Sequence, residues 1–414
     1  MTDERINSIA IKHALKNAVE HGGKAAAGPV INKVLGDLPE ARSDMKTLGK
    51  TVTKTVAEVN SLSVEEQKKR LLEIWPDALE KKPEKPKEFP ELPGNTSGVV
   101  LRFAPNPNGP PTIGSARGAY VNWYYARRYG GKFVLRFDDT DPKTKPPMPE
   151  AYDWYLEDFR WLFGEEPDEV YYLSDMLPEA YEYCEKLIRT GKAYSCKCSQ
   201  EEGRKYRTQG KACPHRNQTP EENMKEWKRM LSGEYKEGEI TIRIKTDLKA
   251  KDPAHRDFVA FKITYAPHPR TGTKYHVWPA LDFIGAIADK IIGVTHIIRG
   301  KDLRDSTTRQ EYVYKYLGWK YPVTLYWGRL KVHGFGKLST SQIRKGIEEG
   351  KYSGWDDPKL PTLKALKKRG ITPEALREWF KSMGFTERDV AADLQILEAI
   401  NRKQKHLKTR KAEE

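Results

Sequence analysis

Hydrophobic residues recur at three- and four-residue spacing in the first part of the chain, a period typical of amphipathic helices. The stripes fall within residues 6–18, 30–35 and 52–62. Ser63 fits a helix N-cap, because two glutamates follow it in the first turn. We therefore expect a small α-helical domain over residues 1–82 and a proline-rich, extended linker over residues 83–98.

Beyond the linker, short apolar runs alternate with helix-length segments. Residues 99–103 and 133–137 are predicted strands, and residues 115–129 between them are a predicted helix. A strand, a helix and a strand in about 40 residues make a βαβ unit, which requires a parallel sheet. A second region of this kind follows, with an apolar segment at 280–292, a strand at 294–299, a helix at 306–317 and a strand at 324–327.

The two βαβ-like regions are separated by a stretch of a different character. Residues 196–275 contain short alternating segments and many turns, so we interpret them as a domain inserted into a split α/β sheet. The sheet would then be formed by residues 99–195 and 276–328, and residues 329–414 would form a helical region after it.

Composition narrows the class of protein. The chain has 414 residues, 38% hydrophobic and 10% aromatic, which excludes a wholly disordered chain. No apolar run reaches about 18 residues, so we expect no membrane-spanning helix, and the start lacks the layout of a signal peptide. The net charge of +15 favours a polyanionic partner, most simply nucleic acid. The basic run between Arg402 and Lys411 is either a solvated helix end or a contact to a phosphate backbone.

Four cysteines are too few for a disulfide framework in a chain of this length. Three of them stand in a Cys-x-Cys pair followed by Cys-x-His, and three thiolates with one imidazole form a tetrahedral zinc set. The alternative is a group of free thiols in a polar turn. Cys184, on a predicted helix, is expected in the core. The predicted ligands of a closed, structural zinc site are Cys196, Cys198, Cys213 and His215.

A loop rich in proline, asparagine and glycine runs from the first strand of the sheet into the next helix. Free backbone N–H groups and the positive end of the helix dipole make such a junction suitable for a phosphate. Gly114 would let a ligand approach the backbone closely. The alternative is an ordinary proline-rich loop.

Four motifs in order resemble the class I glutamyl- and glutaminyl-tRNA synthetases, most of all the archaeal type of the glutamyl enzymes. The loop just described, together with the start of the helix after it, resembles their APxPNG-type loop followed by the HIGH signature. The later motifs are LRFDDTDP at 135–142, VTHIIRG at 294–300 and KLSTS at 337–341, the last where the family has KMSKS. The resemblance implies an α/β fold with a split Rossmann-type parallel sheet, an inserted acceptor-stem-binding domain and N- and C-terminal α-helical domains.

The resemblance implies ATP-dependent ligation of L-glutamate to the 3′ end of tRNA(Glu) through a glutamyl-adenylate. Catalysis would rest on positioning and on stabilising phosphate charge. Both HIGH histidines are replaced here, by Thr112 and Ser115, and the second KMSKS lysine by Thr340. The implied catalytic residues are Lys337, Thr112 and Ser115. The implied ATP-binding residues are Thr112, Ile113, Gly114, Ser115, Lys337, Ser339 and Ser341. Lys337 could instead be a surface lysine in a turn.

Glutamate carries two carboxylates and one ammonium group, so its pocket should offer both cations and an acid. Arg102 and Arg299 match positions that the glutamyl enzymes use for carboxylates, and Asp138 matches the residue that takes the α-amino group. Asn106 lies in the same loop motif. Arg299 favours glutamate over glutamine, because a buried arginine would stay unpaired against a neutral amide. The alternative for the aspartates at 138, 139 and 141 is helix capping or a divalent-cation site.

The implied partners are tRNA(Glu), ATP with Mg²⁺, L-glutamate and structural Zn²⁺, with charging of tRNA(Gln) left open. Five basic residues near the zinc motif would either touch RNA phosphates or be solvated: Arg204, Lys205, Arg207, Lys211 and Arg216. We expect a cytoplasmic monomer without membrane association. Anticodon-binding barrels follow in the archaeal-type enzymes, and we expect them to be absent here. Two alternatives stay open: a core-only paralogue that transfers glutamate to a modified tRNA base or another acceptor, and a catalytically inactive tRNA-binding protein.

Overall fold

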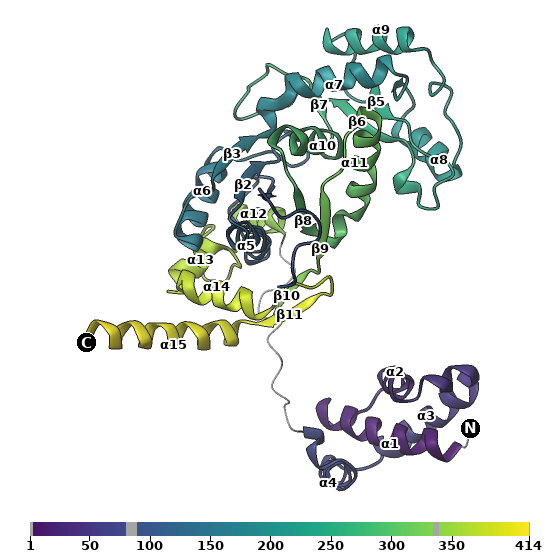
Figure 1. Cartoon of the computed structure of the whole chain (residues 1–414), viewed down its shortest axis with the longest axis vertical. Coiled ribbons are helices and arrows are strands. Elements are labelled where there is room, and N and C mark those ends of the chain that lie inside the picture. The colour runs from purple at the N-terminus through teal and green to yellow at the C-terminus, as the bar shows by residue number, and fades with distance from the viewer. Residues whose placement is uncertain (1–2, 80–88, 334–338, 414) are drawn as a thin grey trace. The chain divides into compact units, whose positions relative to one another are not determined.

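The computed structural model describes residues 3–79, 89–333 and 339–413, with side chains as far as residue 406. Contacts divide the chain into two compact units, Met1–Lys85 and Pro86–Glu414, each of which is described by itself (Figure 1). Within the described residues, no helix combines the length and the apolar character needed to cross a membrane.

The smaller unit is helical, as its hydrophobic stripes predicted. Ala10, Val52 and Leu71, from three different helices, are fully buried in its core. Ser63 caps the last helix through a capping box with Glu66, in which each side chain accepts a hydrogen bond from the other residue's backbone N–H. The helices are α1 (Asp3–Glu20), α2 (Ala27–Asp37), α3 (Met45–Asn60) and α4 (Val64–Ile74), with 3₁₀ turns at Pro39–Asp44 and Pro76–Leu79.

The segment expected to be a linker, residues 83–98, differs in its second part. Residues 80–88 lie outside the described part of the chain. Phe89 and Leu92, however, are buried in the core of the larger unit, and the Leu92 N–H donates to the Tyr129 hydroxyl at 3.0 Å. Two apolar residues between prolines produce no period, so the sequence pattern did not reveal this packing.

Five parallel strands form the main sheet of the larger unit, in the order β3-β2-β1-β8-β9. The predicted split parallel sheet is thus confirmed: β1 pairs with β2 on one side and with the much later β8 on the other. In open parallel sheets, ligands bind outside the carboxyl ends of the strands where the strand order reverses, which here is between β1 and β8. The strands are β1 (Val100–Phe103), β2 (Lys132–Phe137), β3 (Glu169–Tyr172), β8 (His296–Gly300) and β9 (Val323–Trp327).

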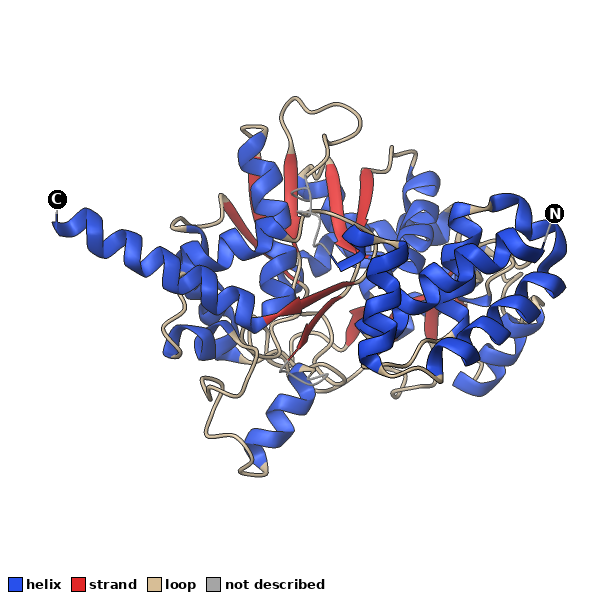
Figure 2. Ribbon diagram, turned by 90° about the horizontal axis from the view of Figure 1, so that it is seen from below, coloured by secondary structure: helices blue, strands red, loops and turns tan. Residues whose placement is uncertain are grey.

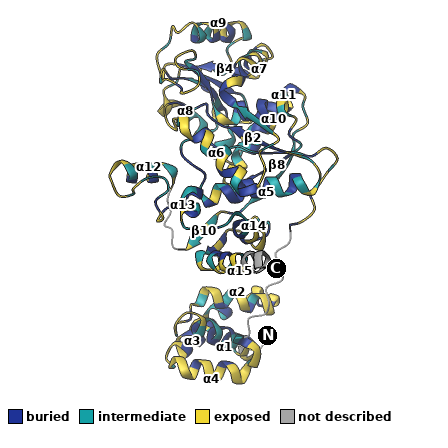
Figure 3. Ribbon diagram, turned by 90° about the vertical axis from the view of Figure 1, so that its left-hand side faces the viewer, coloured by how far each residue is buried: buried dark blue, intermediate teal, exposed yellow. Residues whose placement is uncertain are grey.

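Helices connect the strands of this sheet, and Figure 2 shows the strands of the chain in red among the more numerous helices in blue. Two of them connect the first three strands, and two flank β8 in the sequence. In Figure 3, β2 and α5 are coloured mostly as buried, which agrees with their side chains. The helices are α5 (Ile113–Arg128), α6 (Pro149–Phe163), α10 (Leu281–Ile292) and α11 (Arg304–Leu317).

The residues between the two halves of the main sheet form a second, antiparallel sheet in the order β4-β5-β6-β7. Trp227, Phe261 and Trp278 are fully buried in its core. The sheet begins at Ala193 and ends at Pro279, so it extends slightly beyond the expected insert on both sides. Its elements are β4 (Ala193–Cys196), β5 (Thr241–Ile244), β6 (Phe258–Ile263), β7 (Val277–Pro279), α7 (Leu177–Arg189), α8 (Gln200–Gln209) and α9 (Pro220–Leu231).

The C-terminal region is mainly helical, as expected, but it also contains a two-stranded parallel ribbon that the sequence did not predict. Leu330 pairs with Val390 across 60 residues of chain, and such a pairing leaves no local pattern. The elements are β10 (Leu330–His333), β11 (Val390–Asp393), α12 (Thr340–Glu348), α13 (Leu363–Lys368), α14 (Pro373–Ser382) and α15 (Leu394–Glu413).

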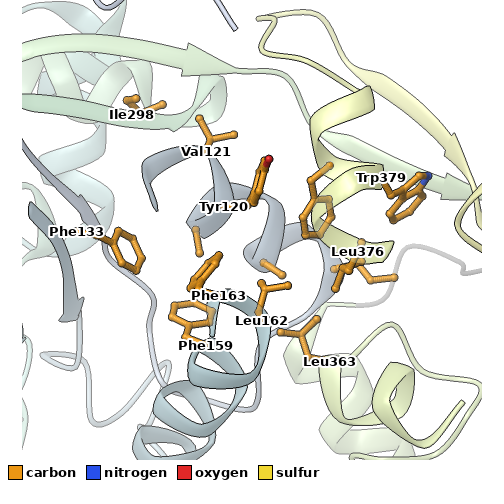
Figure 4. Close-up of a cluster of buried hydrophobic side chains, with 14 of the residues drawn as sticks. Tyr120, Val121, Phe133, Phe159, Leu162, Phe163, Ile298, Leu363, Leu376 and Trp379 are labelled. Carbon is orange, nitrogen blue, oxygen red and sulfur yellow. The ribbon is translucent and has the colours of Figure 1, made fainter. Parts of the chain in front are cut away.

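Helix α14 shares a core with α5 and α6, which ties the C-terminal region to the main sheet. The rings of Tyr120 and Phe380 lie 5.7 Å apart, and Trp379 is fully buried. In Figure 4, Tyr120 lies between Phe163 on one side of this cluster and Leu376 and Trp379 on the other. A displacement of α14 would therefore disturb α5, the helix that begins at the predicted ATP-binding loop.

Close packing of α5 on the sheet depends on Gly118. A Cβ atom at this position would lie 2.6 Å from Trp327 Cζ2 and 3.1 Å from Phe103 Cε2. We expect Gly118→Ala to lower the free energy of unfolding of the larger unit by about 1–3 kcal/mol, because overpacking outweighs the better helix propensity of alanine. Scanning calorimetry would measure it.

Gly49 in α3 provides the matched control, since a Cβ there would have no neighbour within 4 Å. Gly49→Ala should raise the stability of the smaller unit by up to about 1 kcal/mol. Equal effects of the two substitutions would contradict the packing argument.

Candidate active site

A cavity of about 140 Å³ lies at the carboxyl ends of β1, β2 and β8. At about 30 Å³ of liquid volume per water molecule, it has room for four or five waters, which suits a small polar ligand. Three of the four residues predicted to bind glutamate line it: Arg102, Asp138 and Arg299. The cavity also occupies the position at which the strand order reverses, where such sheets bind ligands.

The walls of the cavity contain a buried chain of alternating charges. Arg102 binds both oxygens of Asp289, with Nε–Oδ1 and Nη2–Oδ2 distances of 3.1 and 3.2 Å. Arg136 Nη1 donates to Asp289 Oδ1 at 2.6 Å, and the other side of its guanidinium holds both oxygens of Asp138 at 2.8 and 3.2 Å. The orientation of Arg102 and Asp138 is therefore fixed before any ligand binds.

Burial and charge oppose each other in this chain of residues. Burial raises the pKa of Asp138 above its usual range, although Arg136 opposes the shift. The pKa of Asp289 is lowered: burial would raise it, but Arg102 and Arg136 together outweigh that effect. Both carboxylates accept two or more hydrogen bonds from arginine, which stabilises their ionised forms.

Arg299 differs from the other two arginines because it has no acidic partner among the described residues. Its Nη2 donates to three neutral oxygens, Thr307 Oγ1 at 2.6 Å, Tyr321 Oη at 2.8 Å and Gln310 Oε1 at 3.1 Å. Its Nε is buried without a partner within that part of the chain. The side chain is thus held in place while its charge stays uncompensated.

The cavity therefore carries one excess positive charge. Arg102, Arg136 and Arg299 contribute three, and Asp138 and Asp289 remove two, while Asp282, which also lines the cavity, is balanced by Arg309 at 2.6 Å. A buried charge without a partner is strongly unfavourable. A ligand with a net charge of −1 would compensate it.

Sequence reasoning missed Arg136 and Asp289, although each left a signal. Arg136 is the only charged residue inside the apolar strand FVLRF, and Asp289 interrupts the apolar run at 280–292. A charged residue within such a run is almost never fully buried unless it is paired. The pairing itself joins residues about 150 positions apart, which no local pattern can show.

Asn106, the fourth residue predicted to bind glutamate, does not line the cavity. Its Nδ2 donates to the backbone oxygen of Asp138 at 2.9 Å, so it supports the loop that carries this aspartate. Its Oδ1 is buried without a partner among the described residues.

The predicted ATP-binding loop ends at the start of α5. Thr112 and Ser115 form a capping box there, in which Ser115 Oγ accepts from Thr112 N at 2.7 Å and Thr112 Oγ1 accepts from Ser115 N at 3.4 Å. Ile113 N donates to Pro361 O at 2.8 Å, and Gly114 is exposed. The two hydroxyl groups that replace the HIGH histidines thus complete the first turn, and their contact with ATP stays a prediction.

The KMSKS-like segment reaches the same loop from the other end of the chain. Ser339 caps α12, and Ser341 is exposed in its first turn. Thr340 lies so close to Gly109 that a Cβ atom on the glycine would be 2.4 Å from Thr340 Cγ2. Lys337, the predicted catalytic cation, falls outside the described residues.

The four predicted zinc ligands lie together at the end of β4 and around α8. Their ligand atoms are all within 4.8 Å of one another. Cys196 Sγ is 3.9 Å from Cys213 Sγ and 4.0 Å from His215 Nδ1, and Cys198 Sγ is 3.5 Å from His215 Nδ1. Tetrahedral zinc with ordinary bond lengths places two sulfurs about 3.8 Å apart and a sulfur and a nitrogen about 3.5 Å apart. The residues therefore fit a zinc ion.

The basic residues near this cluster are not equivalent. Arg216 Nε donates to Asp257 Oδ2 at 2.7 Å, and Asp257 also accepts from the Tyr194 hydroxyl at 2.9 Å. Arg216 is thus part of the support beneath the cluster. Arg204, Lys205 and Lys211 are exposed.

Comparison with known proteins agrees with this geometry. A family model described as "tRNA synthetases class I (E and Q), catalytic domain" matches residues 98–407. A protein of Archaeoglobus fulgidus named "Glutamate--tRNA ligase" is 52% identical over 399 residues, which are 96% of this chain and 72% of that protein. One of the same name from Pyrococcus furiosus is 51% identical over 404 residues, 96% of this chain and 70% of that protein.

Solved structures are similar in fold. A glutamate tRNA ligase from Elizabethkingia meningosepticum, in complex with its amino acid, aligns with a TM-score of 0.53 at 21% identity. The alignment covers 75% of this chain and 70% of that protein. A glutamate-tRNA synthetase from Elizabethkingia anophelis aligns with a TM-score of 0.54 at 22% identity, over 74% and 70% of the two chains.

Proposed function

Since the chain belongs to the class I tRNA synthetases of the glutamate and glutamine group, we propose that it joins L-glutamate to the 3′ end of tRNA(Glu) in an ATP-dependent reaction. A carboxylate oxygen of glutamate attacks the α-phosphorus of ATP and releases pyrophosphate. The 3′-terminal hydroxyl of the tRNA then attacks the carbonyl of the glutamyl-adenylate and releases AMP. The substrate supplies the nucleophile in both steps, so the protein acts by positioning and by charge stabilisation.

The uncompensated charge of Arg299 is the observation that supports glutamate as the amino-acid substrate. Glutamate has a net charge of −1, which balances the single excess positive charge of the cavity. Glutamine is neutral and would leave that charge buried and unpaired, at several kcal/mol. Arg102 and Arg299 would hold the carboxylates, and Asp138 would take the ammonium group through the carboxylate lone pairs that Arg136 leaves unused.

ATP would bind beside this cavity, with Mg²⁺ on its phosphates. The start of α5 provides Thr112, Ile113, Gly114 and Ser115, at the positive end of a 16-residue helix. The proximity of Gly109 and Thr340 supports a site shared with the second segment, which contributes Lys337, Ser339 and Ser341. Lys337 would place a mobile cation on the phosphates.

A structural zinc ion would be held by Cys196, Cys198, Cys213 and His215. The spacing of their ligand atoms supports this assignment. Four protein ligands leave no open position, so the ion would fasten the turn after α8 to β4 and would take no part in the chemistry.

The names of the relatives support this reaction over both alternatives, the core-only paralogue and the inactive tRNA-binding protein. Charging of tRNA(Gln) as well, a monomeric state and a cytoplasmic location remain predictions. The domain boundaries expected from the sequence remain a proposal too, apart from the shifts described above.

Pyrophosphate exchange into ATP tests the proposal directly. Zinc-loaded, folded protein should catalyse exchange with glutamate in the presence of total tRNA, and far less with glutamine. No exchange with glutamate plus tRNA would refute the proposed reaction. Efficient charging of a tRNA without an intact anticodon would favour the paralogue instead.

A further inference from the structure

Tyr265 is unusual among the aromatic residues of the chain. Within the described residues, it is the only tyrosine, phenylalanine or tryptophan that is exposed, with half of its surface accessible. It lies two positions after the end of β6, in the loop between β6 and β7 of the inserted sheet. A single exposed aromatic ring is common on protein surfaces, so exposure alone does not indicate a binding site.

The ring of Tyr265 is held rigidly from several sides. It stacks on His276 with a centroid distance of 5.4 Å and an angle of 7° between the planes. Its hydroxyl donates to Tyr235 O at 2.8 Å, and its backbone N–H donates to Glu237 Oε1 at 2.8 Å. His276 is itself fixed, because its Nε2 donates to Met230 O at 3.0 Å. The hydroxyl group of Tyr265 thus has its hydrogen-bond partner within the protein. The exposed part of the side chain is its apolar ring, held in a fixed orientation.

The same loop is fastened to the loop that carries Asp138. His268 Nε2 donates to the backbone oxygen of Asp139 at 2.8 Å, while its Nδ1 accepts from the N–H groups of Arg270 and Thr271. The position of Tyr265 is therefore coupled to the loop that follows β2.

Two lysines link the segments around Tyr265 to the loop after β2. Lys143 pairs with Glu237, the residue that binds the backbone of Tyr265. Lys262 Nζ is 3.4 Å from Asp141 Oδ1. Both lysines belong to the contact between the inserted sheet and the loop after β2, and each keeps more than a third of its side chain exposed, so each is accessible to a phosphate.

We propose that Tyr265, backed by His276, is a stacking platform for a base in the unpaired 3′ end of tRNA. This inference rests on the proposed function. Every base has a π-face, so a rigid, exposed aromatic plane suits single-stranded RNA without requiring a particular base. A protein partner would instead be expected to use a wider apolar surface around the ring.

The distance to the cavity agrees with this assignment. His276 stands five positions before Leu281, which lines the cavity. At about 3.3 Å per extended residue, these five positions span at most about 17 Å. A stacked strand rises about 3.4 Å per nucleotide, so a few nucleotides bridge the platform and the cavity.

A binding experiment on the full chain without glutamate or ATP tests the proposal. The affinity is measured for a tRNA(Glu) transcript and for the same RNA with its unpaired 3′ nucleotides removed. Tyr265→Ala and Tyr265→Leu should weaken binding of the intact RNA about tenfold and leave binding of the trimmed RNA unchanged. Tyr265→Phe keeps the ring and should stay within about twofold of the unsubstituted chain on both RNAs.

Three results would overturn the proposal: no loss on the intact RNA, an equal loss on both RNAs, or equal affinity of the unsubstituted chain for both RNAs. None of these measurements involves the chemical steps. Failure of the proposed reaction would appear separately, as absent pyrophosphate exchange and charging by the unsubstituted chain.

Discussion

Replacing Arg299 with glutamine is expected to raise the KM for glutamate about 100-fold in tRNA-dependent pyrophosphate exchange. The substitution removes the only charge of the cavity that lacks an acidic partner among the described residues. Loss of one partner from a buried pair of charges costs about 2–5 kcal/mol, and each 1.4 kcal/mol corresponds to a factor of ten. The KM for glutamine should change much less, because glutamine has no second carboxylate. The preference for glutamate over glutamine should therefore fall at least tenfold.

Two further variants make this test specific. Arg299→Lys keeps the charge but not the planar fork, and should give an intermediate KM. Arg117 is equally buried and also lacks an acidic partner in the described part of the chain, but it does not line the cavity and binds the backbone oxygens of Gly328 and Gly384. Arg117→Gln should therefore lower the melting temperature and leave the KM for glutamate within about twofold. An unchanged preference in Arg299→Gln would refute the role of this arginine.

Replacing Cys213 with alanine is expected to abolish zinc binding and most of the affinity for tRNA. Purified protein should contain one zinc ion per chain by elemental analysis, and the variant none. Structural zinc contributes folding free energy directly, about 10–16 kcal/mol in zinc-finger peptides, so its loss should unfold the turn after α8. We expect tRNA affinity to fall more than tenfold, and treatment of the unsubstituted protein with a chelator to reproduce the effect.

Cys184 supplies the control for this substitution. It is fully buried on α7 and is the one cysteine outside the four-residue cluster. Cys184→Ala should keep the zinc ion and lower stability only through the small cavity that it creates. Zinc content that is zero in the unsubstituted protein, or unchanged in Cys213→Ala, would contradict the assignment.

The sequence predicted those features that depend on neighbouring residues. The stripes of the smaller unit, the βαβ unit and the capping residue Ser63 are local patterns, and the structure confirms them. The positions of Arg102, Asp138 and Arg299 in one cavity also agree with expectation, because each stands at or near the end of a strand and parallel strands end at one edge.

The features that the sequence did not predict depend on contacts between residues that lie far apart in the chain. Asp289 binds Arg102 and Arg136, from two strands that lie far earlier in the chain. The ribbon of β10 and β11 joins segments 60 residues apart, and Phe89 packs in a core that is completed by much later residues. The resemblance implies ATP contacts for Thr112 and Ser115, whereas their mutual capping is a property of the folded turn.

The interruption of the main sheet by the antiparallel insert also determines when the protein can fold during synthesis. β1 needs β8 as its neighbour, and Leu101 pairs with His296 across 195 residues. At about 5–20 residues per second, a ribosome takes roughly 10–40 s to make that stretch. Throughout this interval one edge of β1 is an open template for wrong pairing, so the nascent chain is a candidate client for chaperones. The cavity that we propose for glutamate forms only when β8 arrives, so a shorter nascent fragment would lack it.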